Sequence, residues 1–383
     1  MRHRDAGGAG ARLDRVLAAV GVIALVAAIV TRPESARAAA SQDWSPFVLV
    51  TGLLLIGLVA DDDGLFAAAG HQLARASPNG SILFLGATVM IGLVTAVLNL
   101  DTSVAFLTPV LVYTARSRGG GEAALLYGCL LLSNAGSLFL PGSNLTNLIV
   151  LGHLHLSGGE FLARMWAPAL AALVVTAVVV AVFEHGSLRV TTNELTRPEP
   201  PVFSLGVLAV GLAIALVVVL SSPALPVAVV GGAAVGIRLA RKKERLRHVA
   251  EVLGIPVLVG LFGVAVALGT LGRAWSGPAT LLAHLGSWET ALFAALASVV
   301  VNNLPAASLL SARAPEHPFS LLVGLNLGPN LFVSGSLAWL LWLRTARSAA
   351  ADPSIARASR IGAVAVPLSM AAALTLLSVT GSS

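Results

Sequence analysis

Apolar runs recur along the whole chain, and they constrain its fold more than any other feature of the sequence. They are about 15 to 22 residues long, close to the roughly 20 residues that an α-helix needs to cross the ~30 Å hydrocarbon layer of a bilayer. Of the 383 residues, 56% are hydrophobic and 11% are charged, and the mean hydropathy is +0.88, which a soluble domain could not bury. The sequence therefore predicts an all-α polytopic membrane protein.

Several classes of protein are excluded by residue content. One cysteine, Cys129, rules out an intramolecular disulfide and a thiolate metal cluster, and we expect no metal site. Aromatic residues are few and the basic residues lie in short loops between apolar runs, so we expect no nucleic-acid partner. No nucleophile–base pair, phosphate-binding loop or ATP-binding motif is apparent in the sequence, which predicts that the chain is not an enzyme.

Most of the apolar runs are predicted to be single crossings, but two are not. The segments 81–113 and 289–311 are interrupted by polar residues and prolines, namely Asn99, Asp101 and Pro109 in the first and Asn302, Asn303 and Pro305 in the second. We expect both to be helical hairpins folded at these centres. The apolar run nearest the amino terminus, residues 16–31, is followed by ARAAAS, and this segment also has the pattern of a signal peptide. Full crossings are predicted near residues 16–31, 46–62, 123–151, 166–183, 204–220, 224–237, 249–270, 320–343 and 361–379.

The distribution of basic residues supports the hairpin interpretation. With a cytoplasmic amino terminus and both hairpins re-entrant, 19 of the 24 Lys and Arg fall on the cytoplasmic side. The outer side then holds Arg32, Arg37, Arg164, Arg273 and Arg313. Because basic residues gather on the cytoplasmic side of membrane proteins, this topology is favoured, and it places the carboxyl terminus outside the cell membrane.

An internal duplication follows from this topology. Crossing, hairpin, crossing, crossing is the order in residues 46–183 and again, with opposite orientation, in residues 249–383. Residues 1–45 hold the first transmembrane helix, and residues 184–248 form a linker with two crossings and a basic cytoplasmic loop. The predicted fold is thus a pair of inverted repeats with two re-entrant helical hairpins, an arrangement found in secondary transporters.

One crossing in each repeat is expected to be a broken transmembrane helix. The sequences SNAGSLFLPGSNLTNLIV and LNLGPNLFVSGSLAWLLW carry Asn, Gly, Ser and Pro at their centres and match at Asn134-x-Gly136 and Asn326-x-Gly328. Backbone groups freed by such breaks must line protein or a water-filled cavity, because lipid cannot hydrogen-bond them. We therefore expect both breaks and both hairpin tips to meet at one site, where buried asparagines supply neutral donors and acceptors.

Asp101 is the costly residue of the first hairpin. A carboxylate at the centre of a membrane helix costs roughly 2.5 to 3.5 kcal/mol even on lenient insertion scales. Asp101, Thr102 or Ser103 can cap the returning arm of the hairpin, and Pro305 suits the first turn of the corresponding arm in the second hairpin. Two interpretations of Asp101 stay open, a helix cap alone or a carboxyl group that takes and releases a proton.

LNLDTSVAFLTPVL, VVNNLPAASLL and LGPNLFVSGSLAWLLWLR resemble the arsenite and antimonite permeases of the ion transporter superfamily, which also includes citrate and divalent anion:sodium carriers. DDDGLF resembles their acidic motif before the first hairpin. The resemblance implies a scaffold, a mobile transport domain with an elevator-like motion, and a homodimer. It places substrate and coupling ion at Asn99, Asp101, Thr102, Asn134, Gly136, Ser143, Asn144, Asn302, Asn303, Pro305, Asn326, Gly328, Asn330, Ser334, Gly335 and Ser336.

Three functions remain open at this point. The first is proton-coupled efflux of arsenite or antimonite, because a neutral hydroxide meets no repulsion from Asp101. The second is a sodium- or proton-coupled carrier of citrate or dicarboxylates, and the third is a membrane scaffold that transports nothing. Asn330 stands where many arsenite permeases have Lys, and FLPGSNLTN departs from their usual motif. Apart from a proton or sodium ion no cofactor is expected, and the resemblance allows a separate ATPase partner.

Labelling of single cysteines tests the predicted topology. In a Cys129→Ser background, cysteines at positions 78 and 120, which flank the first hairpin, should react with a membrane-impermeant thiol reagent from one side of the membrane only, and that side should be the same for both. Positions 286 and 315, which flank the second hairpin, should both react from the opposite side. Reaction of either pair from two different sides would contradict the hairpins.

Overall fold

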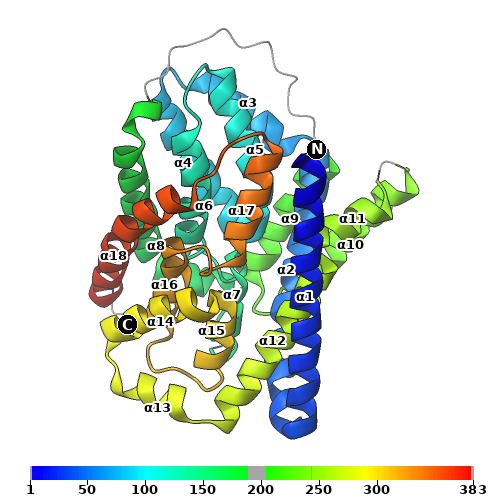
Figure 1. Ribbon diagram of the computed structural model, residues 1–383, viewed down its shortest axis with the longest axis vertical. Coiled ribbons are helices and arrows are strands. Elements are labelled where there is room, and N and C mark those ends of the chain that lie inside the picture. The colour runs from blue at the N-terminus through cyan, green and yellow to red at the C-terminus, as the bar shows by residue number, and fades with distance from the viewer. Residues whose placement is uncertain (1, 155, 189–203, 243, 381–383) are drawn as a thin grey trace.

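The computed structural model describes residues 2–154, 156–188, 204–242 and 244–380, with side chains from residue 15 onward, and these residues form helices and connecting turns (Figure 1). The amino-terminal half contains α1 (Arg2–Thr31), α2 (Pro33–Asp62), α3 (Leu65–Ala76), α4 (Gly80–Leu98), α5 (Leu100–Ser117), α6 (Ala123–Gly136), η1 (Pro141–Ser143), α7 (Leu145–Leu151), α8 (Gly158–Phe183) and η2 (His185–Leu188). The rest contains α9 (Leu205–Val219), α10 (Ala224–Ala240), α11 (Leu246–Leu253), α12 (Ile255–Ala274), α13 (Gly277–His284), α14 (Ser287–Val301), α15 (Asn303–Leu310), α16 (Pro318–Leu327), η3 (Gly328–Leu331), α17 (Leu337–Ser348) and α18 (Ile355–Val379).

Five segments of the described residues are long and apolar enough to cross a membrane as single helices. They are α2, α4, α8, α18 and the nearly continuous pair α11 and α12. Shorter apolar helices, including α6, α9, α10 and α14, accompany them. The prediction of an all-α membrane protein with many spans is confirmed.

Several helices extend beyond the apolar runs from which they were predicted. Helix α2 begins at Pro33 rather than near residue 46, because Pro33 suits the first helical turn, Glu34 faces the positive helix end, and the alanines that follow favour helix. It runs without a break across residues 45 and 46, where the first repeat was predicted to begin. Helices α8 and α18 also start several residues earlier than expected.

Helices α4 and α5 form a hairpin that reverses at Asn99. The Arg118 guanidinium, just after α5, donates a hydrogen bond to the carbonyl of Ser77, just before α4, so the two open ends lie together. Helices α14 and α15 reverse in the same way at Asn302. Ser287 at the start of α14 is hydrogen-bonded to Ser320 in the first turn of α16, the helix that follows α15. In Figure 1 the first hairpin occupies the upper part of the molecule and the second the lower part.

Two other segments are interrupted rather than reversed. Helix α6 ends at Gly136, and the chain passes through η1 before continuing as α7. Helix α16 passes through η3 and an extended stretch before α17 begins at Leu337. Both breaks fall where the Asn, Gly, Ser and Pro clusters predicted them. α17 lies beside α5 in Figure 1, which brings the second break toward the first hairpin.

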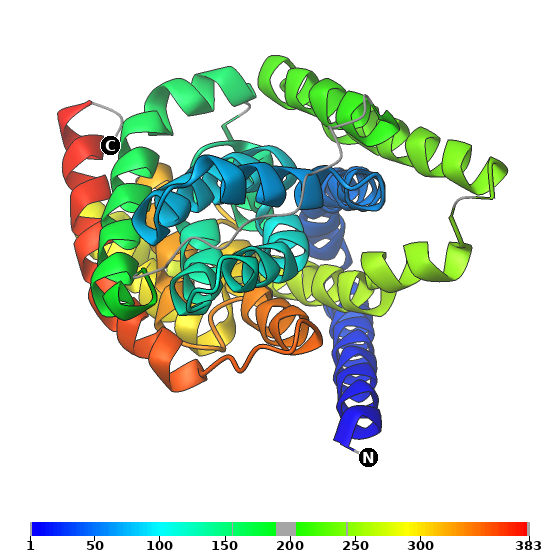
Figure 2. The same ribbon diagram turned by 90° about the horizontal axis from the view of Figure 1, so that it is seen from above.

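Helix α1 packs along α12 at unusually short range. The contact is made by Gly21 of α1 and by Gly260 and Gly263 of α12, where a Cβ atom at Gly260 would lie 2.6 Å from the carbonyl oxygen of Leu17. Small residues at helix crossings are typical of membrane proteins, because close backbone approach supplies the packing energy that lipid cannot supply. Figure 2 shows α1 and α10 on one side of the molecule and α18 on the other.

Substitution of Gly260 by Ala tests this packing. The added methyl group would collide with backbone atoms of α1, and overpacking of this kind costs about 1 to 3 kcal/mol. We expect a lower thermal unfolding midpoint in detergent. Gly236→Ala on α10 is the matched control, because a Cβ atom there would meet open space. Equal midpoints for the two variants would contradict the packing.

Candidate substrate site

Both hairpins turn at an asparagine with a rare backbone conformation. Asn99 has φ 91° and ψ 166°, and Asn302 has φ 79° and ψ 148°. This region is nearly exclusive to glycine, and residues held in such regions cost on the order of 1 to 3 kcal/mol, a strain that clusters at functional sites. The same conformation at both tips indicates that the two hairpins are built alike.

The helix caps at these tips differ from those predicted for the first hairpin. The Asn99 Oδ1 atom accepts a hydrogen bond of 2.8 Å from the backbone N–H of Thr102, so Asn99 caps α5, and the prediction that Asp101, Thr102 or Ser103 does so was wrong. An asparagine can cap from the residue just before the helix, whereas these three already lie within its first turn. In the second hairpin Asn302 caps α15, and Pro305 lies in the first turn as expected.

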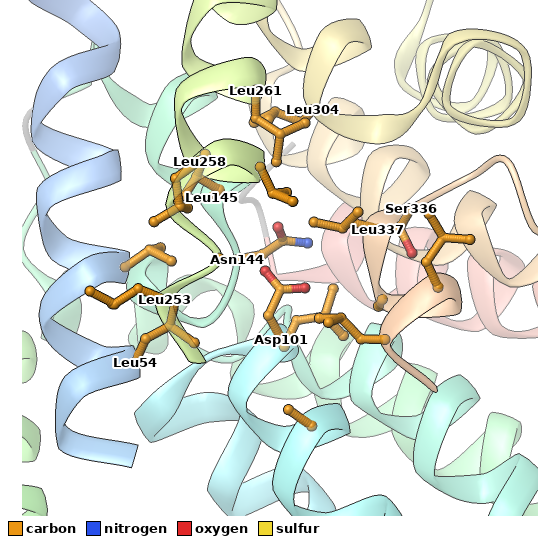
Figure 3. Close-up of a pocket in the computed structure, with 18 of the residues that line it drawn as sticks. Leu54, Asp101, Asn144, Leu145, Leu253, Leu258, Leu261, Leu304, Ser336 and Leu337 are labelled. Carbon is orange, nitrogen blue, oxygen red and sulfur yellow. The ribbon is translucent and has the colours of Figure 1, made fainter. Parts of the chain in front are cut away.

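A cavity of about 180 Å³ joins the two tips and the two breaks (Figure 3). Asp101 of α5 and Asn144, at the start of α7, point toward one another across it. Asn302 and Asn303 at the second tip and Ser336 at the start of α17 also line it. The predicted meeting of hairpin tips and broken helices is thus present around this cavity.

The amino ends of the four helices that follow the tips and breaks, α5, α7, α15 and α17, line the cavity, and the start of α12 at Gly254 lines it as well. The residues before α7 and α17 have matching extended backbones, with φ −151° at Asn144 and φ −153° at Ser336. Amino ends of helices carry partial positive charge and unpaired N–H groups, which favour carboxylates and other oxygen ligands. The arrangement stabilises an acid at Asp101 and suits a solute rich in oxygen.

Unused hydrogen-bonding capacity remains at this site. The Ser336 Oγ atom is buried, with 2% of the residue exposed, and makes no hydrogen bond within the described residues. The Asn99 Nδ2 and Thr102 Oγ1 atoms are buried and unpaired in the same way. Asp101 accepts no hydrogen bond from the described residues either. Because buried polar groups are normally paired, the Ser336 Oγ atom in the cavity wall indicates a group that a bound solute would satisfy, whereas Asn99 and Thr102 do not line the cavity.

Three of the predicted site residues lie behind the cavity in a network of amides. Asn134 donates to Asn330 at 2.9 Å, and Asn144 donates to the Oδ1 atom of Asn326 at 2.7 Å. Asn326 in turn donates to Asn147 at 2.7 Å. These hydrogen bonds join the first break to the second through side chains, and Asn134, Asn326 and Asn330 do not line the cavity.

The remaining predicted residues hold the breaks against the hairpins. Gly136 packs on α4 and Gly328 on α14, so each break contacts the first arm of its own hairpin. The Asn303 N–H group donates to the carbonyl of Gly335 at 2.9 Å, and Asn302 donates to that of Ser334 at 3.1 Å, which fixes the second tip against the second break. Within the first break, Ser143 donates to the carbonyl of Ser137 at 2.5 Å.

Other important residues were missed by the sequence analysis. Leu54 of α2 and Leu258 and Leu261 of α12 form an apolar wall, and Glu251 and Arg344 lie at one end of the cavity. The sequences of these helices have the periodicity of ordinary membrane helices, so they carry no sign of a binding site. The one signal in the sequence was Gly254, which has a left-handed backbone and separates α11 from α12 beside the cavity.

Comparison with known proteins identifies the family. The family model described as citrate transporter (CitMHS) matches residues 9–343. The chain belongs to the CitMHS family. Members of this family are transporters, so the protein is a secondary transporter and not an enzyme.

Relatives of this CitMHS protein include arsenical pump membrane proteins. One from Escherichia coli is 25% identical over 336 residues, covering 78% of each chain, and one from Escherichia coli strain K12 is 24% identical over 356 residues, covering 84% of this chain and 83% of the relative. The inner membrane protein YbiR of Escherichia coli strain K12 is 26% identical over 319 residues, covering 80% of this chain and 81% of that protein. The predicted resemblance to arsenite permeases is confirmed, and the chain is a multi-pass membrane protein.

The crystal structure of the YdaH transporter of Alcanivorax borkumensis has a similar fold. It superposes with a TM-score of 0.53 at 15% identity and covers 90% of this chain and 87% of that chain. At this identity the likeness concerns the fold alone.

Replacement of Asn326 by Leu tests the role of the amide network. It would leave the buried Asn144 Nδ2 and Asn147 Oδ1 atoms without the partner that Asn326 supplies, and each such group costs about 1 to 3 kcal/mol. We expect a marked fall in the thermal midpoint of the detergent-solubilised protein. Thr375→Ala is the control, since its exposed hydroxyl bonds only within α18. An Asn326→Leu protein as stable as this control would show that the network is dispensable.

Proposed function

We propose that this CitMHS protein exports arsenite and antimonite, as neutral hydroxides, in exchange for protons. The observation that carries the proposal is the Asp101 carboxylate, which faces a cavity lined by neutral amides and a free hydroxyl. The names of the arsenical pump relatives support the same substrate class.

The charge of the cavity favours a neutral solute. Among its described lining residues Asp101 and Glu251 are acidic and Arg344 is basic. A multiply charged anion would be repelled by Asp101 at the point where the four helix ends meet, whereas arsenous acid is uncharged at neutral pH. Its hydroxyl groups can donate to Asp101 and accept from Ser336, Asn302 or Asn303 without a thiolate ligand.

Size supports a small solute as well. The cavity volume of about 180 Å³ lies below the roughly 300 to 1,000 Å³ of pockets that hold drug-sized molecules. Leucines make up much of the wall, so hydrogen bonds come from a few polar groups on one side. A compact hydroxide fits this division better than an extended polycarboxylate.

Asp101 is also the residue that we assign to proton coupling. An acid inside a membrane protein is functional by default, because its burial is costly. Ionised Asp101 is stabilised by the four helix ends, and protonated Asp101 can give a hydrogen bond to a neighbouring oxygen. Proton binding and solute binding would then compete for one carboxylate, which links the two flows.

Transport of citrate or a dicarboxylate, driven by sodium or protons, is the second candidate. It is favoured by the description of the family model and by the helix amino ends, which attract carboxylates. A scaffold without transport is the third, and the strained tips and unpaired buried groups weigh against it, because an anchor gains nothing from such costs.

The architecture proposed for transport has two inverted repeats, 46–183 and 249–383, with re-entrant hairpins. The matching tips at Asn99 and Asn302 and the matching breaks support it. We assign the hairpins and breaks to a moving body, and α2 and α12 to a fixed body within a homodimer. The amino terminus is placed in the cytoplasm and the carboxyl terminus outside. The resemblance to arsenite permeases also allows a separate ATPase partner.

Replacement of Asp101 by Asn tests the proposed function. In an arsenite-sensitive host, the protein should confer resistance and the Asp101→Asn variant should lose it at equal expression, because the amide cannot exchange a proton. In inverted vesicles, arsenite uptake driven by an imposed proton gradient should fall to background. Asp352→Asn is the control, because this aspartate is exposed and remote from the cavity.

The alternatives give different results in the same vesicles. Citrate or succinate uptake that persists in Asp101→Asn, together with no arsenite uptake by the native protein, would overturn metalloid export in favour of an organic anion carrier. Absence of uptake of arsenite, antimonite and citrate under proton and sodium gradients would favour the scaffold.

A further inference from the structure

A second cavity lies on the other side of the first break. Its volume is about 400 Å³, and it is lined by residues 41–49 in the middle of α2, by the connection between α9 and α10, and by Arg273 of α12. Pro141 and Gly142 line this cavity, whereas Asn144 and Leu145 line the first one. The break around residues 141–145 is therefore the wall between the two cavities.

A cluster of side chains holds this wall in place. We call it the clasp, and it consists of Gln42 of α2, Arg273 of α12 and His153 after α7. Gln42 donates to the carbonyl of Ile149 in α7 at 2.9 Å and to that of Ser311 after α15 at 3.3 Å.

The clasp joins the proposed fixed body, α2 and α12, to the proposed moving body of hairpins and breaks. Arg273 donates to Gln42 and to the carbonyl of Gly269, and the His153 Nε2 atom lies 2.9 Å from the carbonyl oxygen of Ser311. Arg313, after α15, donates to the carbonyl of Arg273 at 3.0 Å. α2 and α12 are thereby tied to the ends of α7 and α15, which carry the first break and the second hairpin.

The chemistry of the clasp suits contacts that open and close. Asp43, the neighbour of Gln42, is 2% exposed, and its Oδ2 atom has no hydrogen-bond partner in the described part of the chain. Arg273 is the cation that interacts with it electrostatically. A buried acid and base cost free energy unless they are paired. Because the clasp borders the second cavity, water in that cavity can replace the hydrogen bonds of the clasp when it opens.

We propose that the second cavity is the vestibule of the translocation path on the face opposite Glu251 and Arg344, and that the clasp is the gate between this vestibule and the Asp101 cavity. The inference rests on the proposed transport function, because a path with two access sides requires alternating closure. In this structure the clasp is closed, and the Asp101 cavity extends toward Glu251 and Arg344.

A reversible cross-link tests the gate. In a Cys129→Ser background, Gln42→Cys and Gly152→Cys can form a disulfide, because a Cβ atom at position 152 would lie 3.2 Å from the Gln42 Cγ atom. Oxidation should abolish arsenite transport in vesicles and a reductant should restore it. Ala39→Cys with Gly269→Cys is the matched control, which joins α2 to α12 only, with a Cβ distance of 3.1 Å, and should transport when oxidised.

Full transport by the oxidised Gln42–Gly152 protein, with the disulfide verified by mass spectrometry, would overturn the gate and leave the proposed function intact. Failure of the Cys129→Ser protein itself to move arsenite would instead count against the proposed function.

A second measurement then tests the gate without any substrate. A cysteine at position 105, which lines the first cavity, is treated with a membrane-impermeant thiol reagent from the side that bears residues 220–224. The gate predicts faster labelling when Gln42→Ala is added and no change with Thr51→Ala, whose hydroxyl bonds only within α2. Equal labelling rates in the two variants would overturn the gate.

Discussion

Hydrogen bonding of interrupted backbone inside a membrane is the constraint on which this structure depends. A bilayer core offers no water, so each N–H or C=O group released from a helix must find a partner within the protein. This chain releases such groups at four places, the tips at Asn99 and Asn302 and the two breaks. Gathering the four places around one cavity lets each break supply partners for another.

Asparagine solves this problem because one side chain both donates and accepts. Asn326 takes a hydrogen bond from Asn144 and gives one to Asn147, so a residue of α16, beside the second break, completes the first break. Asn134 and Asn330 form the reciprocal link. Trp339 and Trp342 donate to the carbonyls of Pro329 and Leu126, which secures α17 against the second break and against the start of α6. The Ser336 Oγ atom, which lines the cavity, remains unpaired.

Apolar periodicity was sufficient to predict an all-α membrane protein and the approximate place of its long helices, whereas the short helices α3 and α13 were not predicted. The reversals at Asn99 and Asn302 follow from polar residues in the middle of apolar runs, and the breaks follow from clustered Asn, Gly and Ser. Which asparagine lines the cavity was not predictable, because Asn144 and Asn326 have the same composition around them and differ only in the direction that packing gives them. The cap at Asn99 depends on a backbone conformation that asparagine rarely adopts.

Contacts between distant segments were also beyond the sequence. Arg273 was counted as a charge of the outer side, yet it lies in a polar cluster with Gln42, a residue that precedes it by more than half of the chain. The cavity wall from α12 has an ordinary apolar sequence, and only the fold brings it opposite Asp101. Periodicity predicts which face of a helix is apolar but not which neighbour covers that face.

Hydrogen–deuterium exchange measured with and without arsenite tests the convergence of the four helix ends most directly. The account predicts that arsenite slows exchange together at the starts of α5, α7, α15 and α17, and that this protection is lost when Ser336 and Asp101 are both replaced by Ala. Protection confined to one of these helix starts, or located elsewhere in the chain, would contradict a single shared site.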